Sequence, residues 1–393
     1  MSDKIYYLAT VPFESACQID ILPATHPAAQ LHGHSYTASV RVPITTSHVT
    51  PDISPRITTA DKPEPVSFLK EHLQATLAPL NYSLLNKHLK TPTDENLARW
   101  IHKKIDLSGI DRVAIQSTHD SGVDLDNNGH AHIWRRYRFE AAHQLPNVPA
   151  GHQCGRMHGH GFEVILHANQ DLMSDALNSN PAVGETVHMA DMGVDFAHID
   201  RLWQPFHEQL DYTCLNDIKG LENPTSEVLA HWIWQQLKPD FAQLSWVTVY
   251  ETHTSGCHYN GEHYRIWKEQ RFESALKLSA TATGVAKDDK RRRLHGHSYL
   301  IRLHLTAELD EVMGWTVDYG DVKALFKPIY AQLDHQQLDL LEGLEEADVT
   351  SLLYWIKEKM AVSLPQLDRI DLFETPGCGA VLCWGEEGPA LPD

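Results

Sequence analysis

Long apolar runs and paired cysteines are both missing from this sequence, and each absence removes a class of protein. The six cysteines are scattered through 393 residues without a CxxC pair, so a disulfide scaffold is not expected. No stretch of about 18 apolar residues is present to form a transmembrane helix. The N-terminus lacks a basic region followed by an apolar run, so no signal peptide is expected. These absences indicate a soluble, cytoplasmic protein with no membrane partner.

Positive charge is scarce as well. Lysine and arginine number 33 against 52 aspartates and glutamates, which gives a formal net charge of −19. Such an acidic chain is a poor general binder of nucleic acid, so no nucleic-acid partner is expected. Two short basic clusters, at residues 135–138 and 290–293, could still hold a phosphate group, although such runs are usually solvated loops. Histidine, in contrast, is abundant at 26 residues.

Short stretches of sequence recur at similar spacing, which indicates three tandem copies of one plan. Phe-Glu-(Ser/Ala)-Ala begins at residues 13, 139 and 272, and His-Gly-His begins at residues 32, 158 and 295. Each His-Gly-His opens an alternating apolar run that predicts a half-buried strand. Pro-Thr-(Asp/Ser)-Glu, at residues 92 and 224, places a threonine at the N-cap of a helix. The last part of each copy contains a strand that leads to Gln116, Glu251 or Glu374, which we align with one another.

The predicted order of elements in each copy is strand, strand, helix, helix, strand, strand. Boundaries at 1–130, 131–264 and 265–393 fit the motif positions. The copies abut without a low-complexity linker, which suggests a packed assembly. We expect an α+β fold in which each copy is an antiparallel four-stranded sheet with two helices packed on one face.

The middle copy carries a cluster of side chains that could bind a metal. His158 and His160 are two residues apart, which places both imidazoles on one face of a strand. His143 would come from the neighbouring strand of the hairpin. Three neutral imidazoles that leave one position open form a catalytic zinc arrangement, in which zinc could polarise a substrate oxygen or lower the pKa of a bound hydroxyl. The two histidines of the strand by themselves could instead be a solvent-facing pair.

Cys154 lies four residues before His158, in the loop that enters the strand. It could be a fourth metal ligand, which would close the site and make it structural, or an inert thiol. It could also be a reactive group, because a thiol close to a metal or a histidine can have a depressed pKa. We favour the reactive role, since three histidines already suffice for an open zinc site.

The middle copy resembles the 6-pyruvoyl-tetrahydropterin synthase superfamily, and its nearest branch looks like the 6-carboxy-tetrahydropterin synthases of queuosine biosynthesis. The matching text is FEAAHQLPNVPAGHQCGRMHGHGFEV, GVDFAHIDRLW, LNDIKGLENPTSEVLAHWIW and YETHTSGCHY, within about residues 133–262. The outer copies share LHGHSY and a few more positions. The resemblance implies the tunnelling fold, in which three such units close a twelve-stranded barrel. One chain would then form a pseudo-trimeric barrel, and two chains could stack as a homodimer.

The resemblance also implies roles for single residues. One zinc per chain would be bound by His143, His158 and His160, with Cys154 as the catalytic cysteine. The carboxylate of Glu251 would anchor the amino-pyrimidine edge of a pterin, since it can accept two hydrogen bonds from N–H donors. The other residues that we expect to bind substrate are Thr225, Ser226, Glu227 and Glu374.

The middle copy departs from the family at one catalytic position. The family carries Leu-Asp-His, and its Asp-His pair works with the cysteine in proton transfer. The middle copy keeps Asp211, but Tyr212 stands where the histidine should be. The third copy retains the pair as Asp334 and His335.

The third copy has lost the rest of the site, with Leu276 in place of the first zinc histidine and Arg291 in place of the cysteine. We therefore hypothesise a composite site, in which the third copy supplies Asp334 and His335 to the zinc and Cys154 of the second. The alternative is that the pair is a remnant far from Cys154.

The first copy is more eroded. Cys17 stands at the first ligand position, with His32 and His34 in place, so a Cys-His-His metal site is chemically possible. Ala28 replaces the reactive cysteine and Gln116 the glutamate. We expect this copy to be structural.

The resemblance implies a zinc-dependent lyase that converts 7,8-dihydroneopterin triphosphate to 6-carboxy-5,6,7,8-tetrahydropterin, acetaldehyde and triphosphate. One alternative is 6-pyruvoyl-tetrahydropterin synthase activity, because the site residues overlap heavily. Another is a pterin-binding or assembly protein that has lost catalysis, because the middle copy lacks its histidine.

Overall fold

The computed structural model describes residues 3–44, 65–170, 193–279 and 288–389, and the predicted order of elements occurs three times within them. The first unit contains β1 (Lys4–Cys17), β2 (His32–Pro43), α1 (Pro65–Leu77), α2 (Asp94–Lys104), β4 (Arg112–Thr118) and β5 (Ser121–Asp126). The second contains β6 (Ala131–His143), β7 (His158–Gln170), α4 (Phe196–Leu210), α5 (Ser226–Leu237), β9 (Leu244–Thr252) and β10 (Ser255–Tyr259). The third contains β11 (Tyr264–Leu276), β12 (His295–Thr306), α6 (Tyr319–Leu333), α7 (Val349–Met360), β14 (Leu367–Thr375) and β15 (Cys378–Cys383). Two-residue strands follow the first helix of each unit, namely β3 (Ser83–Leu84), β8 (Thr213–Cys214) and β13 (Gln336–Gln337). The boundaries 1–130, 131–264 and 265–393 stay a prediction.

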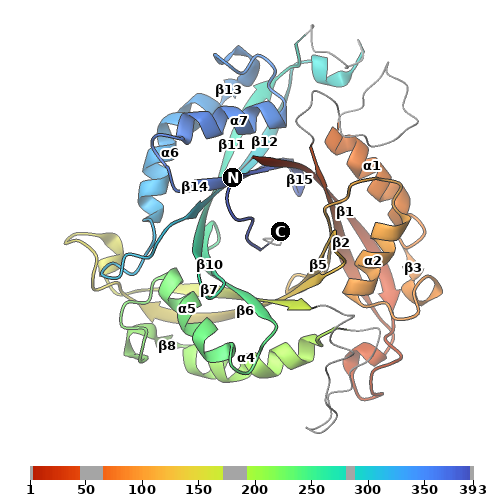
Figure 1. Cartoon of the computed structure of the whole chain (residues 1–393), viewed down its shortest axis with the longest axis horizontal. Coiled ribbons are helices and arrows are strands. Elements are labelled where there is room, and N and C mark those ends of the chain that lie inside the picture. The colour runs from red at the N-terminus through yellow and green to blue at the C-terminus, as the bar shows by residue number, and fades with distance from the viewer. Residues whose placement is uncertain (1–2, 45–64, 171–192, 280–287, 390–393) are drawn as a thin grey trace.

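The twelve long strands form one closed antiparallel barrel, and Figure 1 looks into its ring. Each unit contributes four neighbouring strands, in the order β5-β4-β2-β1 for the first unit. Three pairings between units complete the ring, β5 with β6, β10 with β11, and β15 with β1. The barrel of three units agrees with the prediction from the sequence. Because the ring is closed, the four-stranded sheet of each unit has no unpaired edge strand among the described residues.

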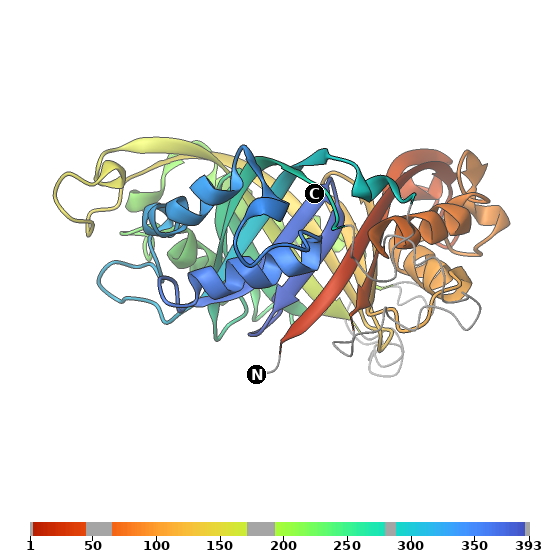
Figure 2. The same cartoon turned by 90° about the horizontal axis from the view of Figure 1, so that it is seen from above.

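The two faces of the barrel wall differ, because successive side chains of a strand point to opposite sides. On β2, Tyr36 and Val40 are buried in the apolar core, whereas Thr37 and Ser39 line a cavity inside the ring. Figures 1 and 2 show the helices on the outside of the ring. The apolar core therefore lies between the outer face of the wall and the helices. None of the helices in the described part of the chain is long and apolar enough to cross a membrane.

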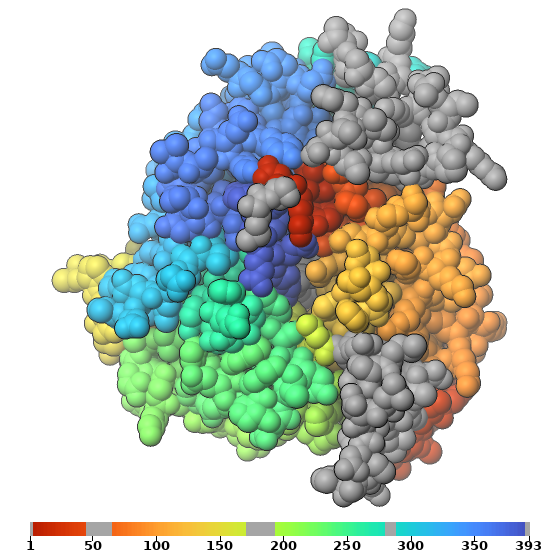
Figure 3. Space-filling model, viewed as in Figure 1, coloured from red at the N-terminus to blue at the C-terminus, as the bar shows by residue number. Residues whose placement is uncertain are grey.

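The two ends of the described chain lie side by side. β1 pairs with β15, from Lys4 opposite Cys383 to Leu8 opposite Gly379, and Figure 3 shows the red and dark blue segments in contact. The segment after β15 turns into the ring (Figure 1). There the Glu387 carboxylate accepts hydrogen bonds from the Tyr6 hydroxyl at 2.9 Å and from Arg41 at 2.7 Å.

A buried ion cluster in the third unit stabilises the barrel wall. Asp371 is 2% exposed and accepts hydrogen bonds from Arg369 at 2.6 and 2.9 Å. Nε2 of His304 lies 3.1 Å from the same carboxylate. Burial by itself would raise the pKa of Asp371, but Arg369 and His304 outweigh it and hold that pKa well below its usual range. The carboxylate therefore stays ionised and balances the buried guanidinium.

Asp371→Asn is expected to lower the free energy of unfolding by about 3 kcal/mol, because it leaves the Arg369 guanidinium buried without its counter-ion. Urea unfolding followed by circular dichroism measures the change. Asp3→Asn is the matched control, since Asp3 pairs with Lys357 at 2.6 Å near the surface, and such pairs contribute about 1 kcal/mol or less. Equal effects of the two substitutions would contradict the role assigned to the buried pair.

Candidate metal centre

Three histidines of the second unit converge at the loop end of the β6–β7 hairpin. His143 is the last residue of β6 and lies opposite His158 at the start of β7, while His160 lies opposite Ala141. Facing residues of adjacent antiparallel strands lie within about 5 Å of each other, and residues two apart share a face. The ring centroids accordingly lie 4.5 Å (His143–His158), 5.1 Å (His143–His160) and 4.9 Å (His158–His160) apart.

Glu251 of β9 joins the three histidines. One potential ligand atom from each of the four side chains lies within 4.8 Å of the others, and Oε1 of Glu251 is 3.9 Å from Nε2 of His160. Burial raises the pKa of Glu251 to about 7, with a further contribution from the carboxylates of Glu227 and Asp318. A cation bound in the cluster would act in the opposite direction and favour the ionised carboxylate.

The histidine rings are oriented as metal ligands are. Nδ1 of His158 lies 2.7 Å from the Arg156 carbonyl oxygen, and Nδ1 of His143 lies 3.1 Å from the Pro224 carbonyl oxygen. These contacts place the proton on Nδ1 and leave Nε2 with a lone pair. Nε2 of His143 and of His160 is buried without a hydrogen-bond partner among the described residues.

The protonation of these rings supports the same interpretation. Burial lowers the pKa of His143 to about 4 and also lowers the pKa of His160, so both rings are neutral at physiological pH. Buried nitrogen atoms without a partner are rare in folded proteins. Three imidazoles are a donor set that fits a divalent ion such as zinc and leave a fourth position open, with the Glu251 carboxylate beside it.

Cys154 lies beside the cluster, in the short 3₁₀ turn η3 (Gln153–Gly155). Its sulfur is outside the group of ligand atoms that the described residues bring within 4.8 Å, where Glu251 takes the fourth place. Burial raises the pKa of the Cys154 thiol, and the carboxylates of Glu251 and Asp318 raise it further. The protein groups alone therefore keep this thiol protonated, and only a bound cation would favour the thiolate.

The three residues expected to line a pterin pocket lie at the start of α5. Thr225, Ser226 and Glu227 are only 3%, 1% and 1% exposed. Oε1 of Glu227 accepts hydrogen bonds from the amide of Thr316 at 3.0 Å and from its hydroxyl at 3.2 Å. The Ser226 hydroxyl lies 2.8 Å from the hydroxyl of Tyr319. In this structure the three residues therefore join the second unit to the third.

The segment of the third unit that makes these contacts, residues 312–319, also lies beside the cluster. Oδ2 of Asp318 is 3.1 Å from Nε2 of His152, and Asn147 donates a hydrogen bond to the Val312 carbonyl at 2.7 Å. Sequence reasoning missed this segment. The signal that could have found it is Val-Asp-(Phe/Tyr), which recurs at residues 194 and 317 directly before a helix.

Asp334 and His335 lie at the other end of the helix that follows this segment. α6 has 15 residues and spans about 22 Å, with Asp318 at its N-cap and Asp334 at its C-cap. Nδ1 of His335 is 3.0 Å from Oδ2 of Asp334, and the His335 side chain is 78% exposed. One chain therefore does not bring His335 within hydrogen-bond reach of Cys154. The composite centre that we hypothesised within one chain is not assembled.

The remaining predicted residues lie apart from the cluster. Oδ1 of Asp211 accepts a hydrogen bond from the Glu140 amide at 2.9 Å. Glu374 is partly buried in the third unit, where its charge contributes to raising the pKa of Tyr299. The two basic clusters are engaged locally, and each includes an ion pair, Arg135 with Asp200 at 2.9 Å and Arg291 with Asp289 at 2.7 Å.

The alignment of Gln116 with Glu251 is wrong by one residue. In each unit a glycine of the last strand pairs with the residue before a β-bulge, and these pairs are Gln116–Gly122, Tyr250–Gly256 and Phe373–Gly379. The counterpart of Glu251 in the first unit is therefore Ser117, and Gln116 lines the cavity inside the ring. The sequence carries the same correction, because the motif Thr-His-x-Ser-Gly directly follows Ser117 in the first unit and Glu251 in the second.

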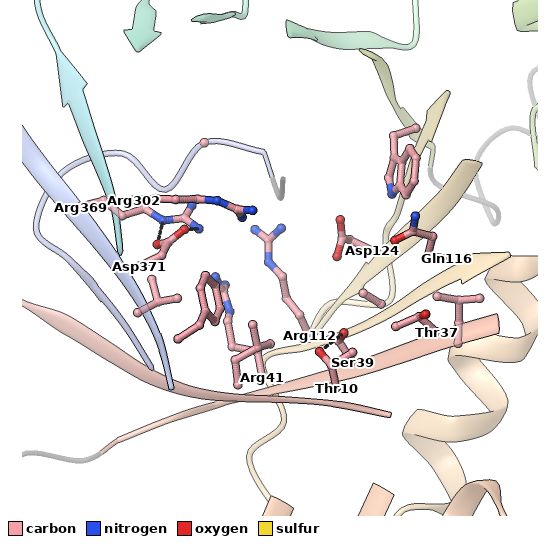
Figure 4. Close-up of a pocket in the computed structure, with 17 residues that line it drawn as sticks. Thr10, Thr37, Ser39, Arg41, Arg112, Gln116, Asp124, Arg302, Arg369 and Asp371 are labelled. Carbon is pink, nitrogen blue, oxygen red and sulfur yellow. Dashed lines mark hydrogen bonds and ion pairs between the residues drawn. The ribbon is translucent and has the colours of Figure 1, made fainter. Parts of the chain in front are cut away.

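The cavity inside the ring is separate from the metal cluster. It has a volume of about 110 Å³ and is lined by arginines and carboxylates of the first and third units. Figure 4 shows Arg112 pointing into it, with Asp124 on one side and Arg302 and Arg369 on the other. The histidine cluster is on the opposite face of the wall, since His143 alternates in phase with the core residue Phe139.

Comparison with known proteins gives the family. The family model described as 6-pyruvoyl tetrahydropterin synthase matches residues 9–128, 132–262 and 265–383, so the chain belongs to this family and carries three copies of its domain. The 6-carboxy-5,6,7,8-tetrahydropterin synthase of Synechocystis sp. is 39% identical over 128 residues, which are 32% of this chain and 91% of that protein. The dihydroneopterin monophosphate aldolase of Pyrococcus furiosus is 24% identical over 111 residues, 28% of this chain and 94% of that protein. The solved structure of Caenorhabditis elegans 6-pyruvoyl tetrahydropterin synthase is 20% identical, with a TM-score of 0.29, and covers 31% of this chain and 95% of its own.

His143→Ala is expected to abolish metal binding at this cluster, because it removes the ligand that joins β6 to the β7 pair. Elemental analysis after incubation with zinc and exhaustive dialysis measures the metal bound per chain, and one equivalent should be lost. His335→Ala is the control, since this exposed side chain lies at the far end of α6 and should leave the metal content unchanged. Undiminished metal in the His143→Ala protein would contradict the site.

Proposed function

We propose that the chain is a zinc-dependent carbon–carbon lyase. It converts 7,8-dihydroneopterin triphosphate and one water to 6-carboxy-5,6,7,8-tetrahydropterin, acetaldehyde and triphosphate. The observation that carries the proposal is the cluster of His143, His158, His160 and Glu251 beside Cys154, in a chain of the tetrahydropterin synthase family. The 39% identity to the cyanobacterial 6-carboxytetrahydropterin synthase supports the carboxylated product. Such a product would serve the synthesis of queuosine and related 7-deazapurines.

Glu251 would hold the pterin ring. Its carboxylate can accept two hydrogen bonds from the amino-pyrimidine edge, and only 13% of its side chain is exposed, so these bonds would form with little competition from water. The metal, when bound, would polarise the side-chain hydroxyls of the substrate. A ring held by Glu251 would lie beside the three histidines, and its side-chain carbons would then be close to the bound metal.

Cys154 would move a proton at the junction of ring and side chain. It lies four residues before His158 in the sequence. The charge of the Glu251 carboxylate contributes to raising the pKa of its thiol. The raised pKa of its thiol suits a group that holds a proton in the resting enzyme and exchanges it when a cation and substrate are bound.

Cys154→Ala is expected to lower kcat by about 10²–10⁴-fold, the usual contribution of a positioned acid or base, while the metal content stays unchanged. Acetaldehyde release from dihydroneopterin triphosphate and mass spectrometry of the pterin measure the reaction. Cys214→Ala is the matched control, since Cys214 belongs to the same unit and its sulfur makes a weak hydrogen bond to Asn216 at 3.9 Å.

The same assay separates the rival functions. A pyruvoyl pterin without acetaldehyde would replace our proposal by 6-pyruvoyl-tetrahydropterin synthase activity. Binding of the pterin without turnover would support a non-catalytic pterin-binding protein, an alternative that Tyr212 favours because it stands where the family carries its relay histidine.

The relay histidine itself would come from a second chain. His335 is exposed and paired with Asp334, and α6 separates it from the cluster of its own chain. We therefore propose that two barrels associate so that Asp334 and His335 of one chain reach Cys154 of the other. A two-fold interface makes this exchange reciprocal, because residues that meet across it do so twice.

A mixture of two inactive variants tests this arrangement. Cys154→Ala and His335→Ala should each be inactive alone. After joint refolding, about half of the dimers would be mixed and each would hold one intact site, so about a quarter of the wild-type activity should return. An active His335→Ala protein, or no recovery in a mixture shown to contain mixed dimers, would overturn the two-chain relay without affecting the lyase proposal.

A further inference from the structure

The first unit contains a second convergence of metal-ligating side chains. Potential ligand atoms of Cys17, His32 and His34 lie within 4.8 Å of one another. Cys17 is the last residue of β1 and is paired with His32 at the start of β2. Its sulfur lies 3.4 Å from Nε2 of His32. Cys17 is only 2% exposed, so this sulfur is held inside the protein next to two imidazoles.

This cluster repeats the geometry of the histidine cluster in the second unit. Nδ1 of His32 lies 2.7 Å from the Gln30 carbonyl oxygen, as Nδ1 of His158 lies 2.7 Å from that of Arg156. The rings of His32 and His34 have centroids 5.0 Å apart at 89°, against 4.9 Å and 84° for His158 and His160. The same backbone contact therefore directs Nε2 of His32 towards Cys17 in the first unit. In the second unit it directs Nε2 of His158 towards His143.

The third unit provides an internal comparison. It keeps His295 and His297, but Leu276 pairs with His295 where the other units have Cys17 and His143. No group of three potential ligands forms at this place among the described residues. The residue at the end of the first strand thus decides whether the pair of histidines becomes a cluster.

The environment of Cys17 differs from that of a buried apolar thiol. The Tyr36 hydroxyl is oriented towards its sulfur at 3.4 Å. Tyr299 occupies the same position in the third unit, where Leu276 replaces the cysteine, and its buried hydroxyl has no hydrogen-bond partner among the described residues. A donor aimed at the sulfur stabilises negative charge on it, and a thiolate is the form of cysteine that binds metals.

We propose that the first unit binds a second divalent ion of the zinc class through the thiolate of Cys17 and the imidazoles of His32 and His34. A thiolate with two imidazoles is a donor set that zinc prefers. The site is a structural one that joins β1 to β2, because the catalytic groups are absent. Ala28 occupies the place of Cys154 in the equivalent 3₁₀ turn, and Ser117 occupies the place of Glu251. The chain accordingly binds two ions, where the sequence predicted one.

Cobalt(II) substitution distinguishes the two sites, because a thiolate ligand gives an intense near-ultraviolet charge-transfer band that imidazole ligands do not give. The full-length wild-type chain, freed of metal and titrated with cobalt(II), should bind two equivalents and show this band. Cys17→Ser should lose the band and one equivalent. His143→Ala should lose one equivalent and keep the band. Each variant is first compared with the wild type by thermal unfolding.

Two further variants keep the test decisive. Cys17→His rebuilds the ligand set of the second unit, and it should bind two equivalents without the band, even if Cys17→Ser fails to fold. The double variant His143→Ala with Cys154→Ala should retain the band, which excludes Cys154 as its source. One equivalent in the wild type, or a band that survives Cys17→His, would overturn the second site. Neither result bears on the lyase proposal, which rests on the other cluster.

Discussion

The pairing of strand edges between units is the constraint on which the rest of the structure depends. A four-stranded sheet has two unpaired edges, and here each edge is satisfied by the next unit, as β5 meets β6 and β10 meets β11. These contacts are hydrogen bonds of the main chain, so they demand strand length and register but few particular side chains. Closure also brings residues 312–319 of the third unit against the second, where Thr316 and Asp318 lie beside Glu227 and His152. The candidate site is therefore completed by a neighbouring unit as a direct result of ring closure.

The same constraint explains how the three sites could diverge. The barrel needs the alternating apolar residues of each wall, such as Phe139 and Phe162, which stack at 5.2 Å, but it does not need the side chains at the loop ends of the hairpins. His143, Cys17 and Leu276 occupy one structural position, and all three are at most 2% exposed. An apolar, a thiol and an imidazole side chain thus fit the same place in the core, and the fold is indifferent to which of them can bind a metal.

The sequence was sufficient for the features that depend on local periodicity. Alternation predicted the long strands, and two histidines two residues apart predicted a cluster on one face, since both follow from the geometry of a single strand. It was insufficient where the structure depends on contacts between distant segments. The 15 residues of α6 place His335 far from Cys154, and Asp318 docks against His152 of the second unit. Neither arrangement leaves a periodic trace in the sequence.

The Asp-His pair shows why a motif can persist for two different reasons. The three units carry Asn81, Asp211 and Asp334 at one position, and each accepts a hydrogen bond from the amide of the glutamate in the preceding strand, at 2.9, 2.9 and 3.0 Å. The residues that follow, Tyr82, Tyr212 and His335, all have positive φ, between 52° and 56°, a conformation that such a side-chain bond helps to hold. The acidic or amide residue is thus explained by the turn alone, since the units without a histidine keep it. Only His335 requires a further explanation, because its side chain is 78% exposed and its contact with Asp334, at 3.0 Å, is absent from the two units that form the same turn with tyrosine. The argument for proton transfer therefore depends on the histidine and not on the pair.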